Sequence, residues 1–182
     1  MKEFNQNTEN FLKQYKDLHS WADRLKINLT EEKFNHKPAS GGWSVGECIE
    51  HLNQVAEMYL PQIKDAITKA EKKELFSNKE FKPRFIQKKM IDSLEPPYKM
   101  KMKTFKSMKP SSSLSMEEVL GRFNKLNNDF IGLIEESDKL DYGSVVVTSP
   151  VSSLIKFKLG EAYLFLAVHT RRHLWQAEQV LK

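Results

Sequence analysis

Four long stretches of the chain repeat apolar residues at intervals of three and four, and this period restricts the possible folds more than any other feature of the sequence. Such spacing places apolar side chains along one face of an α-helix. The four stretches lie at about residues 7–29, 44–72, 115–137 and 159–180. Because each helix must bury its apolar face against another, the sequence predicts an all-α domain built as a four-helix bundle.

Local signals mark where these helices begin and where one of them is interrupted. Ser44 with Glu47, and Ser115 with Glu118, are each predicted to form a capping box, in which two side chains satisfy free backbone N–H groups. Pro61 lies inside the second helix and is expected to kink it or to end its first part.

The connections between the helices differ in length. Thr30 can cap a short helix after the first long one. The connection over residues 75–113 is long enough for a crossover, which would place the second and third helices parallel. Within it we expect a short helix that packs over one end of the bundle, followed by an extended stretch. Their apolar residues are Phe81, Phe85, Ile86 and Met90, then Met100 and Met102. Residues 145–147, three valines before the fourth helix, are also expected to be extended.

The composition fits one soluble globular domain over residues 1–182, with 40% hydrophobic and 29% charged residues. The low glycine and proline counts, 7 of each, argue against an all-β architecture. No apolar stretch is long enough to span a bilayer, and the polar N-terminal residues do not form a secretory signal. The single cysteine excludes an internal disulfide. We therefore expect a cytoplasmic protein without a membrane partner.

The positive charge of the chain is concentrated in one segment. The net charge is +5, but residues 82–109 hold nine basic and two acidic side chains, so this segment carries +7 and the rest −2. Such a segment can attract anions, including nucleic acid or an acidic membrane. It lacks the interleaved aromatic residues of a single-strand binder, and no helix-turn-helix pattern is visible. We expect a solvated loop that steers an anionic small-molecule substrate, and no nucleic-acid partner.

Three histidines occupy positions from which they can share a metal ion. His169 and His173 are four residues apart, so a helix places both imidazoles on the same face, and His51 lies on the apolar face of the second helix. Three imidazoles leave one coordination position open, which is typical of catalytic rather than structural zinc. Nickel, iron and manganese also accept such ligands.

Four further residues lie close to these histidines on the predicted helix faces. Cys48, one turn before His51, can serve either as a fourth ligand or as a small buried hydrophobe. Glu50 and Gln54 flank His51, and either can orient its ring through a hydrogen bond. Gln176, on the inward face of the fourth helix, can line a pocket or bind a substrate.

Other candidate residues receive a simpler interpretation. Trp43 is expected to be a packing anchor at one end of the bundle. Arg171 and Arg172 lie between the paired histidines and are expected to be solvated. His19 and His36 have no ligand-like context and are expected on the surface.

Two segments together resemble the signatures of one protein family. Residues 43–52 (WSVGECIEHL) resemble the second-helix signature of the DinB/YfiT-like superfamily, and residues 167–176 (AVHTRRHLWQ) resemble its fourth-helix signature. The resemblance implies a four-helix bundle with a crossover, which binds a divalent metal through three histidines. The matching positions in this chain are His51, His169 and His173.

The resemblance implies a metal-dependent enzyme and leaves its reaction open. Some members transfer a low-molecular-weight thiol, one branch isomerises with such a thiol as cofactor, and others are described as hydrolases. We expect a metal that activates a water or a low-molecular-weight thiol to attack a small electrophile. The alternative is a non-catalytic metal-binding or stress-associated interaction module, in which Cys48 or Glu50 closes the coordination sphere or no metal is bound at all. A homodimer is compatible with either hypothesis.

Overall fold

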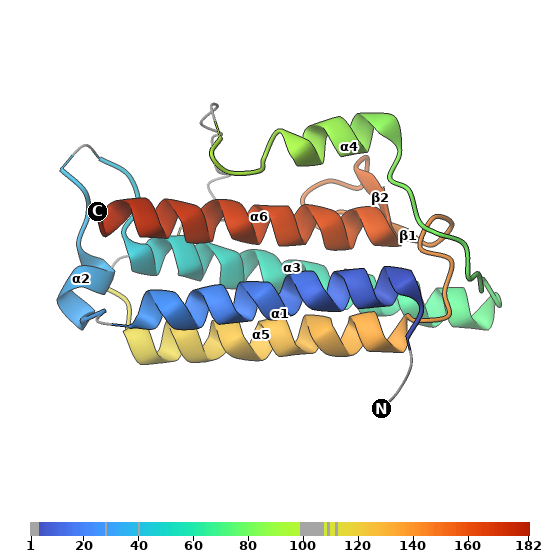
Figure 1. The fold of residues 1–182 in the computed structure, drawn as a ribbon, viewed down its shortest axis with the longest axis horizontal. Helices are drawn as coiled ribbons and strands as arrows, with labels where there is room; N and C mark the ends of the chain where they lie inside the picture. The colour runs from blue at the N-terminus through green and yellow to red at the C-terminus, as the bar shows by residue number, and fades with distance from the viewer. Residues whose placement is uncertain (1–3, 28, 40, 99–107, 109, 112) are drawn as a thin grey trace.

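Four long helices form the body of the protein in the computed structural model, which describes residues 4–27, 29–39, 41–98, 108, 110–111 and 113–182. They are α1 (Gln6–Lys26), α3 (Val45–Lys72), α5 (Met116–Glu136) and α6 (Leu159–Val180). They lie side by side in Figure 1, and the predicted four-helix bundle is confirmed.

The directions of the helices explain the long connection in the chain. In Figure 1, α1 and α6 run one way while α3 and α5 run the other, so that α3 and α5 are parallel neighbours. The chain must therefore return from the end of α3 to the opposite end of the bundle before α5 can begin. This is the crossover that the sequence predicts. Each of α3 and α1 packs against both α5 and α6.

The helices begin where the sequence signals place them. The Ser44 hydroxyl accepts a hydrogen bond from the Glu47 amide, and the Glu47 carboxylate accepts one from the Ser44 amide. Ser115 caps α5 by accepting a hydrogen bond from the Glu118 amide at 3.4 Å. The return bond, from the Ser115 amide to the Glu118 carboxylate, is not found among the described residues, so only half of this predicted capping box forms. The sequence predicts a kink or a break at Pro61 within a helix that extends to about residue 72. The helix does not end at Pro61, and α3 continues to Lys72 as predicted. Proline has no backbone N–H, so the helix lacks one hydrogen bond at this residue. The packing of α3 against the bundle before and after Pro61 offsets the lost stability.

Shorter elements are attached to the bundle. Helix α2 (Glu31–Asn35) is capped by Thr30 and inserts Phe34 against Gly46, where an added Cβ would lie 2.6 Å from the ring. Strands β1 (Val146–Thr148) and β2 (Lys156–Lys158) form an antiparallel hairpin, which confirms the expected extended stretch of valines.

Helix α4 (Phe85–Asp92) corrects one prediction. It packs along α6, with Ile91 and the following Leu94 against Val168, rather than over one end of the bundle. The residues expected to pack, Phe85 and Ile86, are 70% and 76% exposed, and Met90 is 39% exposed. Phe81, before the helix, packs against Gly160, where an added Cβ would lie 2.5 Å from the ring. The expected extended stretch around Met100 and Met102 lies outside the described residues.

A buried carboxylate fastens the crossover connection to the first turn of α6. Glu161 is fully buried and accepts hydrogen bonds from the Arg84 guanidinium at 2.6 and 2.9 Å. The backbone amides of Arg84 and Lys158 donate to it at 2.9 and 2.8 Å. Burial alone would raise the pKa of this carboxyl, but these hydrogen bonds outweigh it and hold the pKa below its usual range.

We expect Glu161→Gln to lower the free energy of unfolding at neutral pH by about 2–3 kcal/mol, because it removes the charge that Arg84 and two amides solvate. The folded pKa lies below the unfolded value of about 4.3. The difference in the free energy of unfolding between wild type and variant should therefore have its full size at a pH above the unfolded-state pKa of Glu161. It should shrink as the pH falls through the folded-state pKa. Urea unfolding at several pH values measures it.

Asp65→Asn is the matched control, since Asp65 pairs with Lys69 on the exposed face of α3. Its effect should stay within about 0.5 kcal/mol. A loss of stability that is equal for the two variants would contradict the role given to Glu161.

Candidate metal centre

Three histidine rings meet where α3 begins and α6 ends. One nitrogen each of His51, His169 and His173 lies within 4.8 Å of the others. The ring centroids are 4.6 to 5.2 Å apart. The antiparallel packing of α3 and α6 causes this meeting, because it sets residue 51 opposite residues 169–173 in the same way that it sets Tyr59 against Phe165.

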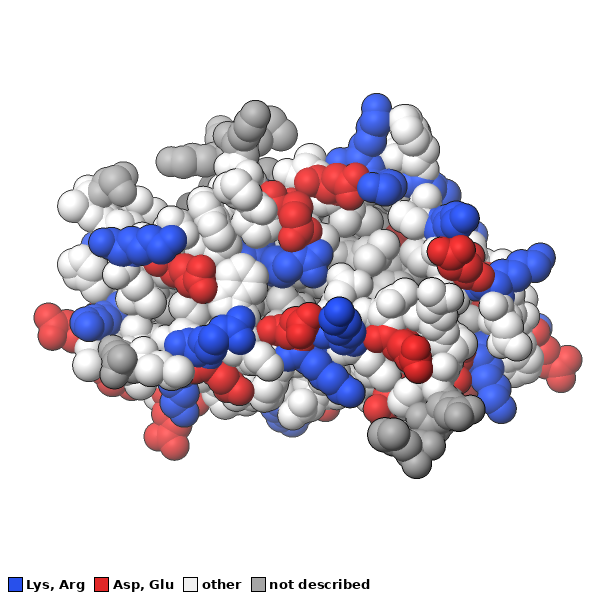
Figure 2. All heavy atoms as spheres, in the orientation of Figure 1, with Lys and Arg blue, Asp and Glu red and all other residues white. Residues whose placement is uncertain are grey.

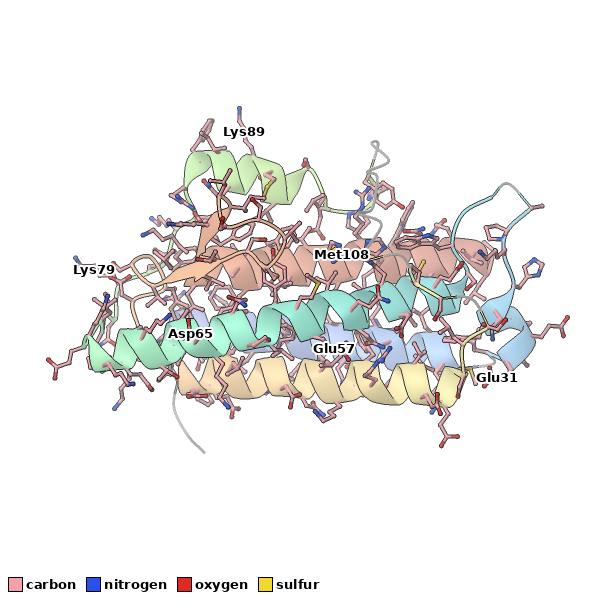
Figure 3. All side chains as sticks on the ribbon, turned by 180° about the vertical axis from the view of Figure 1, so that it is seen from behind. Glu31, Glu57, Asp65, Lys79, Lys89 and Met108 are labelled. Carbon is pink, nitrogen blue, oxygen red and sulfur yellow. The ribbon has the colours of Figure 1, made fainter. Side chains whose placement is uncertain are left out.

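Hydrogen bonds orient two of the three rings. Nδ1 of His51 lies 3.0 Å from the backbone carbonyl oxygen of Met108, and Nδ1 of His173 lies 3.1 Å from Oε1 of Gln176. Both oxygens can only accept, so each Nδ1 carries the proton and donates it. The lone pair of each neutral ring is then on Nε2, free to bind a metal. Figure 3 labels Met108 beside the α3 and α6 helices.

The protein environment keeps the three imidazoles neutral. Burial lowers the pKa of His51, and the Met108 carbonyl opposes this effect. Burial, together with the nearby His51 and Arg172, lowers the pKa of His169 to about 3. Burial, together with the nearby His169, His51 and Arg172, also brings the pKa of His173 well below its usual value. Neutral imidazole is the form that binds a metal, so the ligand lone pairs are available near neutral pH.

Aromatic side chains enclose the histidines. The Trp43 ring centroid lies 5.0 Å from that of His51 and 5.6 Å from that of His173, which it stacks on at 25°. Phe165 stacks on His169 at 5.8 Å. Gly41 and Gly42, with φ of +78° and +126°, form the turn that leads into Trp43, and these angles favour glycine. The aromatic walls restrict rotation of the histidine rings.

The donor set fits a divalent transition metal. Three nitrogens bound to one ion at about 2.1 Å can be no more than about 4.2 Å apart, so the observed separations require only small side-chain rotations. A cluster of three neutral imidazoles with two oriented Nδ1–H groups is the arrangement that such ions prefer. No carboxylate or thiolate belongs to this cluster within the described part of the chain.

The remaining predicted site residues have separate roles. Cys48 is fully buried outside the cluster, and burial, with the neighbouring Glu47, raises the pKa of its thiol, so it packs as a small hydrophobe. Glu50 forms an ion pair with Arg122 on α5 instead of orienting His51. Gln54 does not bond to His51 either. Its buried Oε1 has no hydrogen-bond partner among the described residues.

The basic residues between the paired histidines differ from their expected state. Arg171 forms an ion pair with Glu95 at 2.6 Å and also reaches Gln14 on α1. Arg172 is only 5% exposed, and its guanidinium carbon lies 3.4 Å from the centre of the Tyr98 ring. The prediction that both are solvated is therefore wrong for Arg172. The arginine stacks on Tyr98 because the part of the crossover connection that follows α4 lies against this face of α6.

The sequence does not predict the roles of two residues at the centre, Met108 and Trp43. The Met108 carbonyl comes from the backbone, so no residue type could reveal it. Trp43 was expected to be a packing residue, and its position one residue before the α3 cap was the signal that it lies near His51, two turns into the helix. The other two histidines are as expected: His36 is exposed and His19 is partly exposed beside Asp23.

Comparisons with known sequences and structures identify the family of this chain. The profile of the DinB superfamily matches residues 11–177. The chain belongs to the DinB superfamily. The structure of YfiT from Bacillus subtilis, described as a probable metal-dependent hydrolase with an unusual four-helix bundle topology, is similar with a TM-score of 0.61 and 12% sequence identity. The match covers 99% of this chain and 89% of that one. No curated protein sequence matches significantly.

We expect Gln176→Ala to weaken metal binding by this DinB-superfamily protein about 10- to 100-fold, because His173 loses the acceptor that fixes its Nδ1–H. Titration with zinc against a competing chelator measures the affinity. Gln179→Ala is the matched control, since Gln179 is exposed on the same helix and its side chain accepts a hydrogen bond from Lys182. Equal affinities for the two variants would contradict the role of Gln176.

Proposed function

We propose that this protein is a metal-dependent enzyme in which His51, His169 and His173 hold a divalent metal. Its substrate is a small electrophilic molecule, attacked by a water or by a low-molecular-weight thiol. The observation that carries the proposal is the convergence of three neutral imidazole nitrogens within 4.8 Å. When bound, a divalent metal supplies Lewis acidity and lowers the pKa of a water or thiol in the remaining position.

The surrounding residues support chemistry at this open position. Three uncharged ligands do not neutralise a dication, so an anionic fourth ligand is favoured. Arg172 adds a positive charge close enough to lower the pKa of both His169 and His173. Trp43 and Phe165 exclude water from the rings, which strengthens electrostatic interactions at the site.

The carboxylates closest to the histidines along α3 already form hydrogen bonds and ion pairs with other residues. Glu47 takes part in the capping box and pairs with Lys37 at 2.8 Å, and Glu50 pairs with Arg122. Neither is placed as a general base. We therefore propose that the nucleophile is generated by the metal itself rather than by a side-chain carboxylate.

The non-catalytic alternative has less support. A closed coordination sphere would need Cys48 or Glu50 as the fourth ligand. Cys48 lies outside the cluster, and Glu50 is held by Arg122. The description of YfiT as a probable metal-dependent hydrolase also favours the enzymatic reading.

His173→Ala should abolish both metal content and turnover, because two imidazoles remain where three are required. Elemental analysis of untagged protein gives the metal content. Hydrolysis of p-nitrophenyl acetate and conjugation of monobromobimane to cysteine test the two nucleophiles. His36→Ala, on the exposed side of α2, should retain both metal and activity.

Turnover by His173→Ala after complete loss of metal would exclude the proposed mechanism. Metal-dependent conjugation that requires the added thiol identifies a thiol transferase, whereas metal-dependent ester cleavage without thiol identifies a hydrolase.

A further inference from the structure

Large apolar side chains protrude from one side of the molecule, away from the metal centre. Phe85 and Ile86, on the first turn of α4, are 70% and 76% exposed. Leu154 and Ile155, just before β2, are 91% and 45% exposed. A gathering of exposed large apolar residues is unusual on a soluble protein and indicates an interaction site.

These two groups belong to one surface. Nη2 of Arg84 donates to the carbonyl oxygen of Lys156 at 3.0 Å, so the start of α4 touches the start of β2. Phe85 follows Arg84 directly, and Ile155 precedes Lys156 directly. Figure 1 shows α4 above the hairpin. We call this region the α4–hairpin surface. Its apolar members are Phe85, Ile86, Val146, Leu154 and Ile155, and its basic members are Lys82, Lys88, Lys89, Lys156 and Lys158.

Lysines outnumber carboxylates around the apolar side chains, where Lys82 pairs with Glu80 and Lys88 pairs with Asp92. Lys89 projects outward from α4 in Figure 3, and its Nζ lies 4.5 Å from the centre of the Phe85 ring. Neither Lys89 nor Lys156 has an ion-pair partner among the described residues. Figure 2 shows blue, red and uncharged side chains close together in the region of α4. Lysines that surround protruding apolar groups complement an anionic partner.

The shape of the surface favours a bilayer over a folded partner. Residues 149–155 (SPVSSLI) form an uncharged loop between the strands, and its most exposed side chain, Leu154, protrudes. Protruding apolar side chains need a complementary pocket in a protein, whereas the interfacial region of a bilayer accommodates them without one. A second copy is disfavoured, because a two-fold interface would set the same lysines against each other.

We propose that the α4–hairpin surface docks this protein onto an anionic lipid bilayer. Phe85, Ile86 and Leu154 enter the interfacial region, and the surrounding lysines contact lipid phosphates. This is a peripheral contact, which revises the expectation of no membrane partner. It needs no transmembrane segment, and no helix in the described part of the chain is long and apolar enough to span a membrane.

Co-sedimentation with vesicles tests the proposal. The wild-type protein should bind vesicles of phosphatidylcholine mixed two to one with phosphatidylglycerol, bind pure phosphatidylcholine much more weakly, and be released by salt. The double variants Phe85→Ser with Leu154→Ser, and Lys89→Glu with Lys156→Glu, should each bind about tenfold more weakly. All four positions are exposed, so thermal unfolding and metal content should stay at wild-type values.

Matched controls separate this surface from general charge and hydrophobicity. Lys13→Glu with Lys16→Glu, on the exposed side of α1, makes the same change in net charge, and Ile27→Ser removes an apolar side chain that is 67% exposed at the end of α1. Both should bind like wild type. Absence of binding to the anionic vesicles at low salt, or equal losses in the control variants, would overturn the proposal. So would a wild-type dimer in light scattering that Phe85→Ser with Leu154→Ser converts to a monomer, because the surface would then belong to a second copy.

Discussion

The antiparallel packing of α3 against α6 is the interaction on which the candidate centre depends. It buries the apolar seams of both helices and, in doing so, sets a single histidine near the start of one helix against a pair near the end of the other. The hydrophobic effect supplies the driving force and is indifferent to imidazole. The way in which the apolar faces of α3 and α6 are aligned therefore determines that the three histidine rings meet inside an apolar interface.

The crossover connection contributes to both ends of this helix pair. At the start of α6, Arg84 reaches the buried carboxylate of Glu161. At the start of α3, the carbonyl oxygen of Met108 accepts a hydrogen bond from Nδ1 of His51. Between them, Tyr98 stacks on Arg172 beside the histidine pair. The crossover connection is required to return the chain to the opposite end of the bundle. It also orients side chains around the metal centre.

The bundle was predictable because its signals are local: a period of three and four residues, and capping boxes such as Ser44 with Glu47. The histidine positions were predictable for the same reason, since two of them are one helical turn apart. The sequence could not reveal contacts between distant segments. The prediction that Phe85 and Ile86 pack against the bundle is wrong, because the pattern of apolar residues does not show which side of a short helix faces the bundle. The residues that α4 and the following turn bury are Ile91 and Leu94. Likewise, Arg172 is buried by Tyr98, which belongs to a segment without regular periodicity.

The bond from His51 to the carbonyl of residue 108 has an evolutionary consequence. Every amino acid carries a main-chain carbonyl, so this acceptor survives any replacement of the methionine that preserves the local path of the chain. The Met108 side chain is buried in the core, so a replacement that fits the same space would keep both the packing and the tautomer of the histidine. Residue type at this position would then report the packing of the core, whereas the orientation of the histidine would depend only on the course of the main chain.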